Sequence, residues 1–349
     1  MKGLIIIKAL TTLFNFFKEI GHVIIAIVLL IPFVATMGND DSATTEIYTN
    51  ENPTNQYIMQ YKETEIAGHR GGSGLAPQNT MMAFENAVKN RETYGIDYIE
   101  FDVQITKDGK LVTVHDLTYD NVSDAVEFFG KENIQVSSLT YEEARQLNMG
   151  EKFKFYGEKI YKGLRGDDIP DNLRIPLCDD VFSYIEENCP DKGMKYLVEV
   201  KSMGTNGHKA TDELYKLIKK YNLEDRIIWS TFDPTISSYM EKNYPEISRS
   251  ANALEALQFY FYARMDWDFK TVNASYEVLH VPYGESALDG LINIGTRQVI
   301  NYAHKNNIAI QFWTVDNAED VAYLAKNGAD CIMTDYPNMV YETLSSIDY

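Results

Sequence analysis

The sequence predicts an α/β fold, a (β/α)8 barrel preceded by one N-terminal transmembrane helix. Two observations predict this architecture, one for the barrel and one for the membrane helix. From about residue 62 onward, short apolar runs rich in β-branched residues alternate with helical patterns, and eight such runs are present. One long apolar stretch near the N-terminus predicts the membrane helix. A doubly wound open sheet is the alternative to the barrel.

The transmembrane helix is predicted from Ile20 to Met37, which is almost wholly apolar and, at about 18 residues, near the lower limit for crossing a bilayer. Lysines precede this stretch and acidic residues follow it, which places the rest of the chain outside the cell. Secretion after cleavage of a signal peptide is the alternative. Residues 38–61 are polar and lack an apolar period, so they are interpreted as a linker, and the barrel domain is assigned to residues 62–349.

The eight candidate strands are Ile66–His69, Tyr98–Val103, Tyr196–Val200, Ile227–Thr231, Ile247–Ala251, Glu277–Val281, Ala309–Trp313 and Cys331–Thr334. Helices are predicted between several of them, at Thr80–Asn90, Thr211–Tyr221, Arg297–Lys305 and Ala318–Asn327. The least regular part of the pattern is residues 254–289.

A hairpin follows the second strand, because Lys107, Asp108 and Gly109 form a turn signal before the apolar residues 111–115. This return strand is antiparallel and cannot count among the barrel strands. If Ile105 pairs with Val112, then Asp102 faces His115. Residues 117–176 do not fit the alternation and are predicted to form an insertion at the open end of the barrel.

Composition narrows the class of protein. With 45% hydrophobic and 12% aromatic residues, the 349-residue chain can bury a large core. A formal net charge of -19 argues against binding to nucleic acid, which requires clustered cations. Three cysteines without a CxxC pair favour buried thiols over a zinc site or a disulfide framework. The sequence does not predict an oligomeric state.

Carboxylates alternate at the ends of two predicted strands. Glu100 and Asp102 are two residues apart, so both face the same side of one strand, and Glu199 ends the next strand along the chain. Carboxylates that point into a barrel repel one another unless a cation lies between them. They predict a site for one divalent cation, Ca²⁺ or Mg²⁺. The alternative is a salt-bridge network in which Lys201 or Arg70 neutralises the acids.

Two histidines accompany these carboxylates. His69 ends the first predicted strand and precedes Arg70 and two glycines, whereas His115 returns on the hairpin. A lone histidine is most often a hydrogen-bonded core residue, but a pair can exchange protons near neutral pH. Arg70 can bind phosphate with two parallel hydrogen bonds. Phe232 and Trp313, at two further strand ends, are predicted to line a substrate pocket, with packing at the rim as the alternative.

These residues resemble the glycerophosphodiester phosphodiesterase family. The matching motifs occur in the family's order and span residues 63–345: His69-Arg70-Gly71, Ala76-Pro77-Gln78-Asn79-Thr80, Glu100-Phe101-Asp102-Val103, Thr106-Lys107-Asp108-Gly109, Val114-His115-Asp116, Val198-Glu199-Val200-Lys201, Thr231-Phe232, Trp313-Thr314-Val315-Asp316, Gly328-Ala329-Asp330 and Thr334-Asp335-Tyr336-Pro337.

The resemblance implies a TIM-barrel enzyme that cleaves glycerophosphodiesters to glycerol 3-phosphate and an alcohol. The resemblance implies that Glu100, Asp102 and Glu199 bind a divalent metal. It also implies that His69 and His115 act as general acid and base and that Arg70 and Lys201 contact the phosphate. The family also carries a small insertion after the second histidine. Gln78 and Asp316 depart from the family's common Glu and Asn, and an arginine expected after His115-Asp116 is absent, which bears on substrate preference.

The sequence therefore predicts a membrane-anchored, metal-dependent phosphodiesterase with an extracytoplasmic catalytic domain and a glycerophosphodiester substrate. Two alternatives keep the same chemistry: a lysophospholipase D-type enzyme and a hydrolase of a wall glycerol-phosphate polymer. A further alternative, from another class, is a noncatalytic barrel that binds phosphodiesters. The paired histidines argue against it, because binding alone does not need an acid and a base.

Overall fold

The computed structural model describes residues 43–49, 52–189, 193–284 and 292–349. The predicted transmembrane helix at residues 20–37 lies outside this part of the chain. Among the described residues, the structure contains no helix that is long and apolar enough to cross a membrane.

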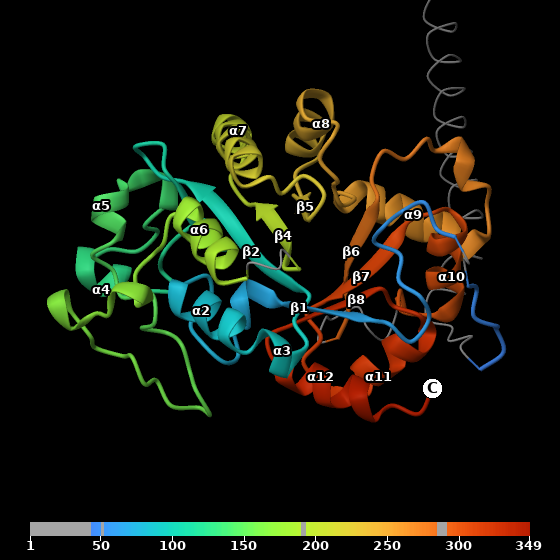
Figure 1. Ribbon diagram of the computed structural model, residues 1–349. Helices are drawn as coiled ribbons and strands as arrows, with labels where there is room; N and C mark the ends of the chain where they lie inside the picture. The colour runs from blue at the N-terminus through green and yellow to red at the C-terminus, as the bar shows by residue number, and fades with distance from the viewer. Residues whose placement is uncertain (1–42, 50–51, 190–192, 285–291) are drawn as a thin grey trace, which may run out of the picture.

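Seven parallel strands of the described chain form one curled sheet (Figure 1). In the order in which they pair, the strands are β5 (Ile227–Ser230), β4 (Lys195–Val200), β2 (Tyr98–Ile105), β1 (Glu65–Gly68), β8 (Cys331–Thr334), β7 (Ala309–Trp313) and β6 (Val278–Pro282). Parallel strands covered on both faces are typically apolar throughout, and all eight residues of β2 are buried. The architecture is α/β and TIM-barrel-like, as the sequence predicts.

The fifth predicted strand, Ile247–Ala251, is not a regular strand in the structure. Arg249 bridges Trp229 of β5, and Ser250 bridges Val278 of β6, so this segment joins the two outer strands of the sheet through isolated contacts. The segment is short because Asn252 already caps the next helix, accepting hydrogen bonds from its first turn. The other seven predicted strands are confirmed with small differences at their ends.

Helices cover the outer face of the sheet (Figure 1). They are α2 (Met81–Lys89), α3 (Arg91–Tyr94), α6 (Cys178–Asn188), α7 (Gly204–Tyr221), α8 (Pro234–Asn243), α9 (Ala253–Met265), α10 (Arg297–Lys305), α11 (Ala318–Asn327) and α12 (Pro337–Ser346). The predictions for α10 and α11 are confirmed, and α7 begins at Gly204 rather than at the predicted Thr211.

Aromatic packing fixes the position of β2 against this helical layer. Phe101 of β2 contacts Phe84 of α2 and Phe182 of α6, each edge to face with ring centroids 5.5 Å apart. All three rings are fully buried, and pairs of this geometry each contribute about 0.5–1.5 kcal/mol beyond the burial of their area. Because side chains alternate along a strand, Phe101 faces the helices while Glu100 and Asp102 face the inside of the barrel.

The hairpin after β2 is confirmed, but its predicted register was wrong by one residue. β3 (Leu111–Thr113) is antiparallel to β2, with Ile105 opposite Leu111 rather than Val112. The amide of Thr106 donates to the carbonyl of Lys110, so the loop contains three residues, and Gly109 adopts the positive φ of 79° that such a loop requires. Asp102 therefore lies opposite Val114, and His115 comes one residue later.

The insertion at residues 117–176 forms a small lobe with its own apolar core beside the barrel (Figure 1). It contains the short helices α4 (Ala125–Phe129) and α5 (Tyr141–Ala144). Val112 and Val114 of the hairpin pack into this core together with Tyr119 and Leu147. The lobe is thereby fixed to the same hairpin that carries His115.

Part of the stretch interpreted as a linker packs under the barrel. Tyr57 and Ile58 are buried, with 3% and 7% of their surfaces exposed, in a cluster that includes side chains of the strands. The amide of Met59 donates to Asp330 over 2.7 Å, and Asn55 donates to the carbonyl of Glu277 over 2.7 Å. Residues 52–61 thus close the end of the barrel opposite the carboxyl ends of the strands.

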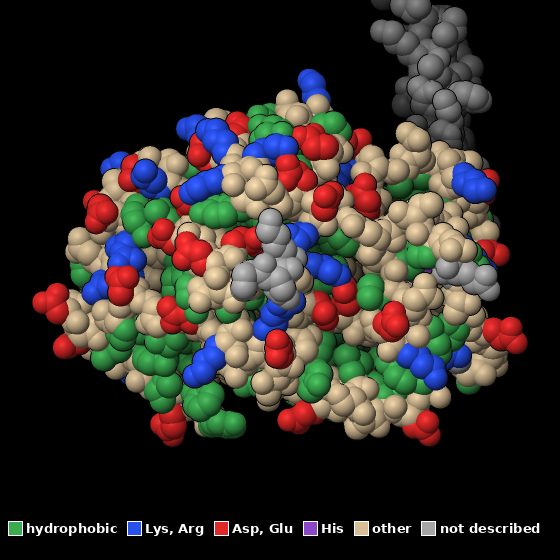
Figure 2. Space-filling view, viewed as in Figure 1, with side chains coloured by type: hydrophobic (Ala, Val, Ile, Leu, Met, Phe, Trp, Pro, Cys, Tyr) green, Lys and Arg blue, Asp and Glu red, His purple; other side chains and the backbone are tan. Residues whose placement is uncertain are grey.

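The surface carries charges of both signs. Figure 2 shows Lys and Arg side chains interspersed with Asp and Glu side chains over the face viewed. The three cysteines are free and buried, which confirms the prediction of packed thiols.

Candidate active site

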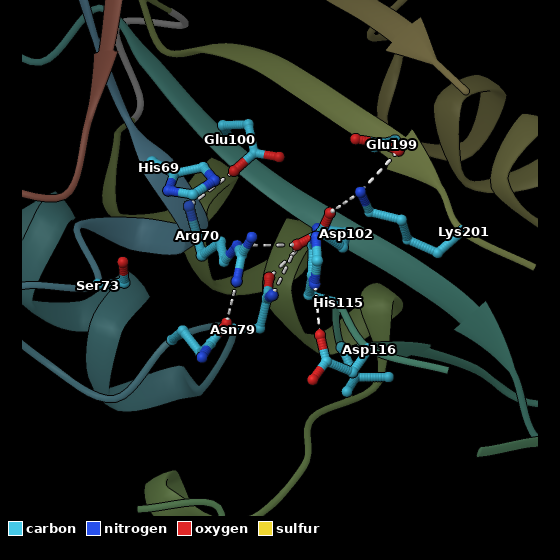
Figure 3. A network of polar contacts seen from close by, with 12 residues as sticks. His69, Arg70, Ser73, Asn79, Glu100, Asp102, His115, Asp116, Glu199 and Lys201 are labelled. Atoms are coloured by element: carbon cyan, nitrogen blue, oxygen red, sulfur yellow. Dashed lines mark hydrogen bonds and ion pairs between the residues drawn. The ribbon is translucent and has the colours of Figure 1, made fainter. Parts of the chain in front are cut away.

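Polar side chains gather where β1, β2 and β4 end (Figure 3). Glu100 and Asp102 project from β2, and Glu199 projects from β4 in the position that pairs with Asp102. Glu100 and Asp102 are buried, with 5% and 1% of their surfaces exposed. The structure therefore brings together the three carboxylates that the sequence predicts as metal ligands.

Two cations contact these carboxylates. Lys201 Nζ lies 2.7 Å from Glu199 Oε1 and 3.4 Å from Asp102 Oδ1. Arg70 Nε lies 3.5 Å from Asp102 Oδ2, while the Arg70 amide donates to Glu100 Oε2 over 2.7 Å. In the part of the chain that the structure describes, no group of three or more His, Cys, Asp or Glu side chains is arranged to hold a metal. The contacts present are those of the salt-bridge network.

The pKa values of the three carboxylates differ because their partners differ. Burial, followed by the nearby charge of Asp102, raises the pKa of Glu100 to about 7. Burial also raises the pKa of Asp102, but the charges of Lys201 and Arg70 outweigh it and lower that pKa below its ordinary value. Burial raises the pKa of Glu199 although Lys201 opposes it. Negative charge is thus incompletely compensated at Glu100.

His69 is oriented by a carboxylate from the other end of the chain. Its Nδ1 lies 2.6 Å from Asp335 Oδ1, which also accepts a hydrogen bond from the Ser73 hydroxyl over 2.5 Å. Burial lowers the pKa of His69, but the hydrogen bond to Asp335 and the charge of Glu100 outweigh it, so the pKa lies above the ordinary 6.5. Asp335 follows β8, the neighbour of β1 in the ring.

His115 is oriented by the residue that follows it. Its Nδ1 lies 2.7 Å from Asp116 Oδ1, and Asn121 of the insertion donates to Asp116 Oδ2 over 2.9 Å. The hydrogen bond from His115, despite some burial, lowers the pKa of Asp116 to about 2. Gln104 donates to the backbone carbonyls of residues 114, 115 and 116, which holds this end of the hairpin in place.

Backbone geometry presents Arg70 to the site. Arg70 has a positive φ of 51°, which is uncommon for a residue other than glycine and is found at binding sites. Gly71 follows with a φ of 82°, and a Cβ there would meet Ala83 at 2.9 Å, so only glycine permits this approach to α2. The Arg70 guanidinium donates to Gln78 Oε1 over 2.5 Å.

Asn79 connects the loop that carries Arg70 to Asp102, one of the three carboxylates predicted to bind a metal. Its side-chain amide donates to Asp102 Oδ2 over 2.9 Å and accepts from the Asp102 amide over 3.2 Å. Asn79 also has a positive φ, of 56°, and Thr113 of the hairpin donates to its carbonyl. This buried residue therefore fixes the relative position of the loop, β2 and β3.

Two adjoining cavities open onto these groups, and His69, Arg70, Pro282 and Trp313 line both. A polar cavity of about 600 Å³ extends toward the insertion, past Asn121 and Asp316. An apolar cavity of about 350 Å³ contains His115 and the three carboxylates and extends toward α9. Phe232 and Trp313, which are predicted to line a substrate pocket, contact each other edge to face with centroids 5.8 Å apart, and both line the apolar cavity.

Several residues of the site were not singled out by the sequence reasoning. Asp335, Asp116 and Asn79 lie inside motifs quoted for the family resemblance, and a search for carboxylates adjacent to histidines would have found Asp116. Asp335 had no such signal, because 266 positions separate it from His69. His280 also lines the apolar cavity, on β6, where its ring lies 3.0 Å from Gln311 Oε1.

A barrel that presents two carboxylate-oriented histidines, two cations and three carboxylates to one cavity is an enzyme site suited to phosphate esters. Comparison with known proteins makes this specific: the model of the glycerophosphoryl diester phosphodiesterase family matches residues 69–339, and the chain belongs to that family. It is therefore a phosphoric diester hydrolase.

One relative in this family is a glycerophosphodiester phosphodiesterase of Caldanaerobacter subterraneus subsp. tengcongensis, which is 32% identical over 79% of this chain and 95% of its own length. The fold is similar to that of an Oleispira antarctica phosphodiesterase solved with the product sn-glycerol-3-phosphate (TM-score 0.60, 20% identity, 81% of this chain and 97% of the other). The fold is also similar to that of a glycerophosphodiester phosphodiesterase of Agrobacterium tumefaciens (TM-score 0.56, 19% identity, covering 80% of this chain and 99% of the other).

Proposed function

We propose that the protein hydrolyses glycerophosphodiesters to glycerol 3-phosphate and an alcohol, using His69 and His115 as general acid and base. The observation that carries this proposal is that each histidine is paired with a carboxylate through Nδ1, while both rings line the same cavity. This pairing leaves Nε2 of each ring to exchange a proton with a substrate. Relatives in the family that are named glycerophosphodiester phosphodiesterases, such as the Caldanaerobacter protein, support the substrate class.

The two cations suit the phosphate group. Arg70 and Lys201 lie on opposite sides of Asp102, and both line the cavity that holds the histidines. Arg70 Nε is buried and has no hydrogen-bond partner among the described residues, so a phosphate oxygen can supply one. Donors fixed before the substrate binds stabilise the charge that develops in the transition state. One histidine then deprotonates the nucleophile, and the other protonates the leaving alkoxide.

Glu100, Asp102 and Glu199 are proposed to hold one divalent cation, Ca²⁺ or Mg²⁺. The donor set fits, because all three groups are carboxylates and hard cations prefer oxygen ligands. The raised pKa of Glu100 reflects a buried charge that lacks a full counter-charge. When bound, such a cation polarises the phosphoryl group. Lys201 and Glu199, now in contact, separate in this proposal, and Lys201 is then available to the phosphate.

Chelation tests the proposal directly. Treatment with EDTA is expected to abolish release of glycerol 3-phosphate from glycerophosphocholine, and added Ca²⁺ or Mg²⁺ is expected to restore it. Glu199→Gln should weaken metal binding measured by calorimetry, whereas Glu213→Gln, in an ion pair with Lys216 on the outer face of α7, should not. Full turnover by metal-free protein would contradict the metal-dependent mechanism.

A noncatalytic binding barrel is the competing hypothesis from another class. It predicts that the unmodified protein binds glycerophosphocholine but releases no product, so that His69→Ala and His115→Ala have no activity to remove. Hydrolysis of a wall glycerol-phosphate polymer has less support, because a protein of net charge -19 repels a polyanion at long range.

We also propose that residues 20–37 anchor the catalytic domain on the outer face of the membrane. The apolar stretch and the lysines that precede it support this placement. Protease added to intact cells should then digest or release the domain, and protection until the cells are lysed would contradict it.

A further inference from the structure

A basic and aromatic hairpin projects from the insertion and takes no part in the contacts of the catalytic groups. Residues 152–162, called the finger below, contain four lysines and one glutamate, a net charge of +3 in a chain whose net charge is -19. In Figure 1 the finger lies in the green loop that extends below the insertion lobe. We propose that the finger docks on an anionic lipid bilayer, with its aromatic tip among the lipid head groups and its lysines against the lipid phosphates.

The tip of the finger is a two-residue hairpin turn that carries a tyrosine. Phe155 and Glu158 exchange both backbone hydrogen bonds, at 2.9 and 3.0 Å, and Tyr156 and Gly157 between them have positive φ values of 48° and 88°. Asn or Asp normally occupies the first position of such a turn, because a bulky residue is disfavoured at positive φ. Tyr156 nevertheless occupies it, with 93% of its surface exposed. The turn itself does not require this ring, which favours a role in contact with a partner.

Other apolar side chains lie beside Tyr156. Phe155 and Ile160 are 36% and 52% exposed, and the rings of Phe155 and Tyr156 meet edge to face with centroids 4.6 Å apart. Single exposed apolar residues are common on protein surfaces, whereas a group of them at a projecting tip marks an interaction site. Tyrosine suits the boundary between lipid and water, because its ring is apolar and its hydroxyl stays hydrated.

The lysines of the finger determine the charge of the partner. Lys154, Lys159 and Lys162 are exposed, and none of them forms an ion pair within the described ranges of the chain, whereas Lys152 contacts Glu127 at 3.3 Å. Exposed charges act over about 10 Å at 0.1 M salt. The local charge of the finger, rather than the total charge of the protein, therefore decides what the tip attracts, and that partner is an anionic surface.

The base of the finger is fixed to the insertion lobe. Phe153 stacks on Tyr161 across the two arms, with centroids 6.1 Å apart. Asn148 donates to the carbonyl of Tyr161 over 2.7 Å, and the amide of Gly163 donates to the buried carboxylate of Glu151 over 2.9 Å. Because these contacts hold the hairpin in one conformation, docking costs less conformational entropy than it would for a flexible loop.

The position of the finger gives docking a consequence for the enzyme. Lys152 and Phe153, at the base of the finger, line the polar cavity. A docked tip therefore turns the mouth of the barrel towards the lipid surface. The inference does not rest on the proposed reaction, so an absence of glycerophosphocholine hydrolysis would contradict the proposed function and leave docking to be judged by its own measurement.

The test uses the full chain with a fluorescent label on the finger. The three native cysteines are buried, so Glu158→Cys provides a thiol that an environment-sensitive dye can modify selectively. Lys216→Cys places the same dye on the outer face of α7 as a reference. With vesicles of phosphatidylcholine and phosphatidylglycerol, the finger label should brighten and shift to shorter emission wavelength, and the α7 label should do neither. No response of the finger label, or an equal response to phosphatidylcholine alone, would overturn the inference.

Charge substitutions in the Glu158→Cys protein test the role of the lysines. Exchange of the three unpaired finger lysines for glutamine should lower the ratio of inserted to free finger about a hundredfold, because each basic residue near an anionic bilayer is worth about 1 kcal/mol. The matched control changes the net charge equally at exposed lysines of α7 that already contact carboxylates, and it should leave the ratio unchanged: Lys216→Gln, Lys219→Gln and Lys220→Gln. Equal losses in the two triple variants would overturn the inference.

Substitution of the tip separates insertion from attraction by charge alone. Tyr156→Ala should lower the same ratio at least tenfold, because burial of an aromatic side chain contributes about 1.5–3 kcal/mol. Tyr341→Ala removes a tyrosine that is 41% exposed on α12 and should leave the ratio unchanged. A full response of Tyr156→Ala, together with an equal response of the finger label to soluble polyphosphate, would overturn the inference in favour of a dissolved polyanion. Circular dichroism of all variants confirms folding.

Discussion

The two halves of the barrel rim differ in the kind of side chain that they present to the substrate. The half formed by β8, β1, β2 and β4 carries the ionisable groups: both oriented histidines, both cations and the three carboxylates. The half formed by β5, residues 247–251 and β6 presents neutral and apolar groups, among them Phe232, Ala251 and His280. The charged half can fix the phosphate and carry out the reaction, whereas the other half can only select what is attached to the phosphate.

Replacing one histidine in each half gives the largest expected contrast. His69→Ala removes a group placed for proton transfer and should lower kcat by about 10²–10⁴-fold. His280→Ala removes a neutral ring that contacts Gln311 and should lower kcat less than about tenfold, since it takes no proton near pH 7. Steady-state assays with glycerophosphocholine measure both. Similar losses in the two variants would show that the rim is not divided in this way.

The two orienting carboxylates should give a smaller effect. Asp335→Asn leaves His69 in place but removes the charge that pairs with its Nδ1, as well as the strongest acceptor for the Ser73 hydroxyl. We expect kcat to fall by about 10–100-fold, within the range of acid–base contributions. Asp116→Asn should cost less, because the His115 side chain is 31% exposed and water can solvate its charged form, whereas the His69 side chain is only 11% exposed. A larger loss for Asp116→Asn than for Asp335→Asn would reverse this ranking.

The smallest effect concerns stability at low pH. The pKa of His280 is lowered by burial to about 4, below its ordinary 6.5, so the folded state favours the neutral ring. Its contribution to stability is complete above pH 6.5 and is lost as the pH falls toward 4, because the unfolded chain takes up the proton first. Between pH 7.5 and pH 4.5, the unfolding free energy of the native protein should fall about 2 kcal/mol more than that of His280→Gln. Urea unfolding at the two pH values measures the difference, and identical losses would contradict it.

Much of the charged half could be predicted from the sequence because its residues are close in the chain. The period of two along a strand places Glu100 and Asp102 on one side, and the turn at Lys107–Gly109 returns His115 toward them. The register of that hairpin was predicted wrongly, since the identity of turn residues does not settle how many residues the loop contains. Asp335 was not predicted to contact His69, because the contact depends on β8 lying beside β1.

The apolar half was much harder to predict, for a physical reason. Several of its apolar side chains come from α9. This helix has no single apolar face that a periodic pattern could reveal. The segment at 247–251 is predicted as a strand, yet only Arg249 and Ser250 bridge the neighbouring strands, and Asn252 already caps α9. Long-range packing, rather than local preference, decides both features.

The closure of the barrel's lower end by residues 52–61 has a practical consequence for how the domain can be cut. A protein that began at residue 62 would lose Tyr57 and Ile58 from its core and leave the carboxylate of Asp330 without the amide of Met59. The boundary of the independently folding unit therefore lies before these residues rather than at the first strand. Any fusion partner or surface attachment placed at residue 61 would interrupt the core itself, whereas one placed ahead of residue 43 would leave the described contacts of that segment intact.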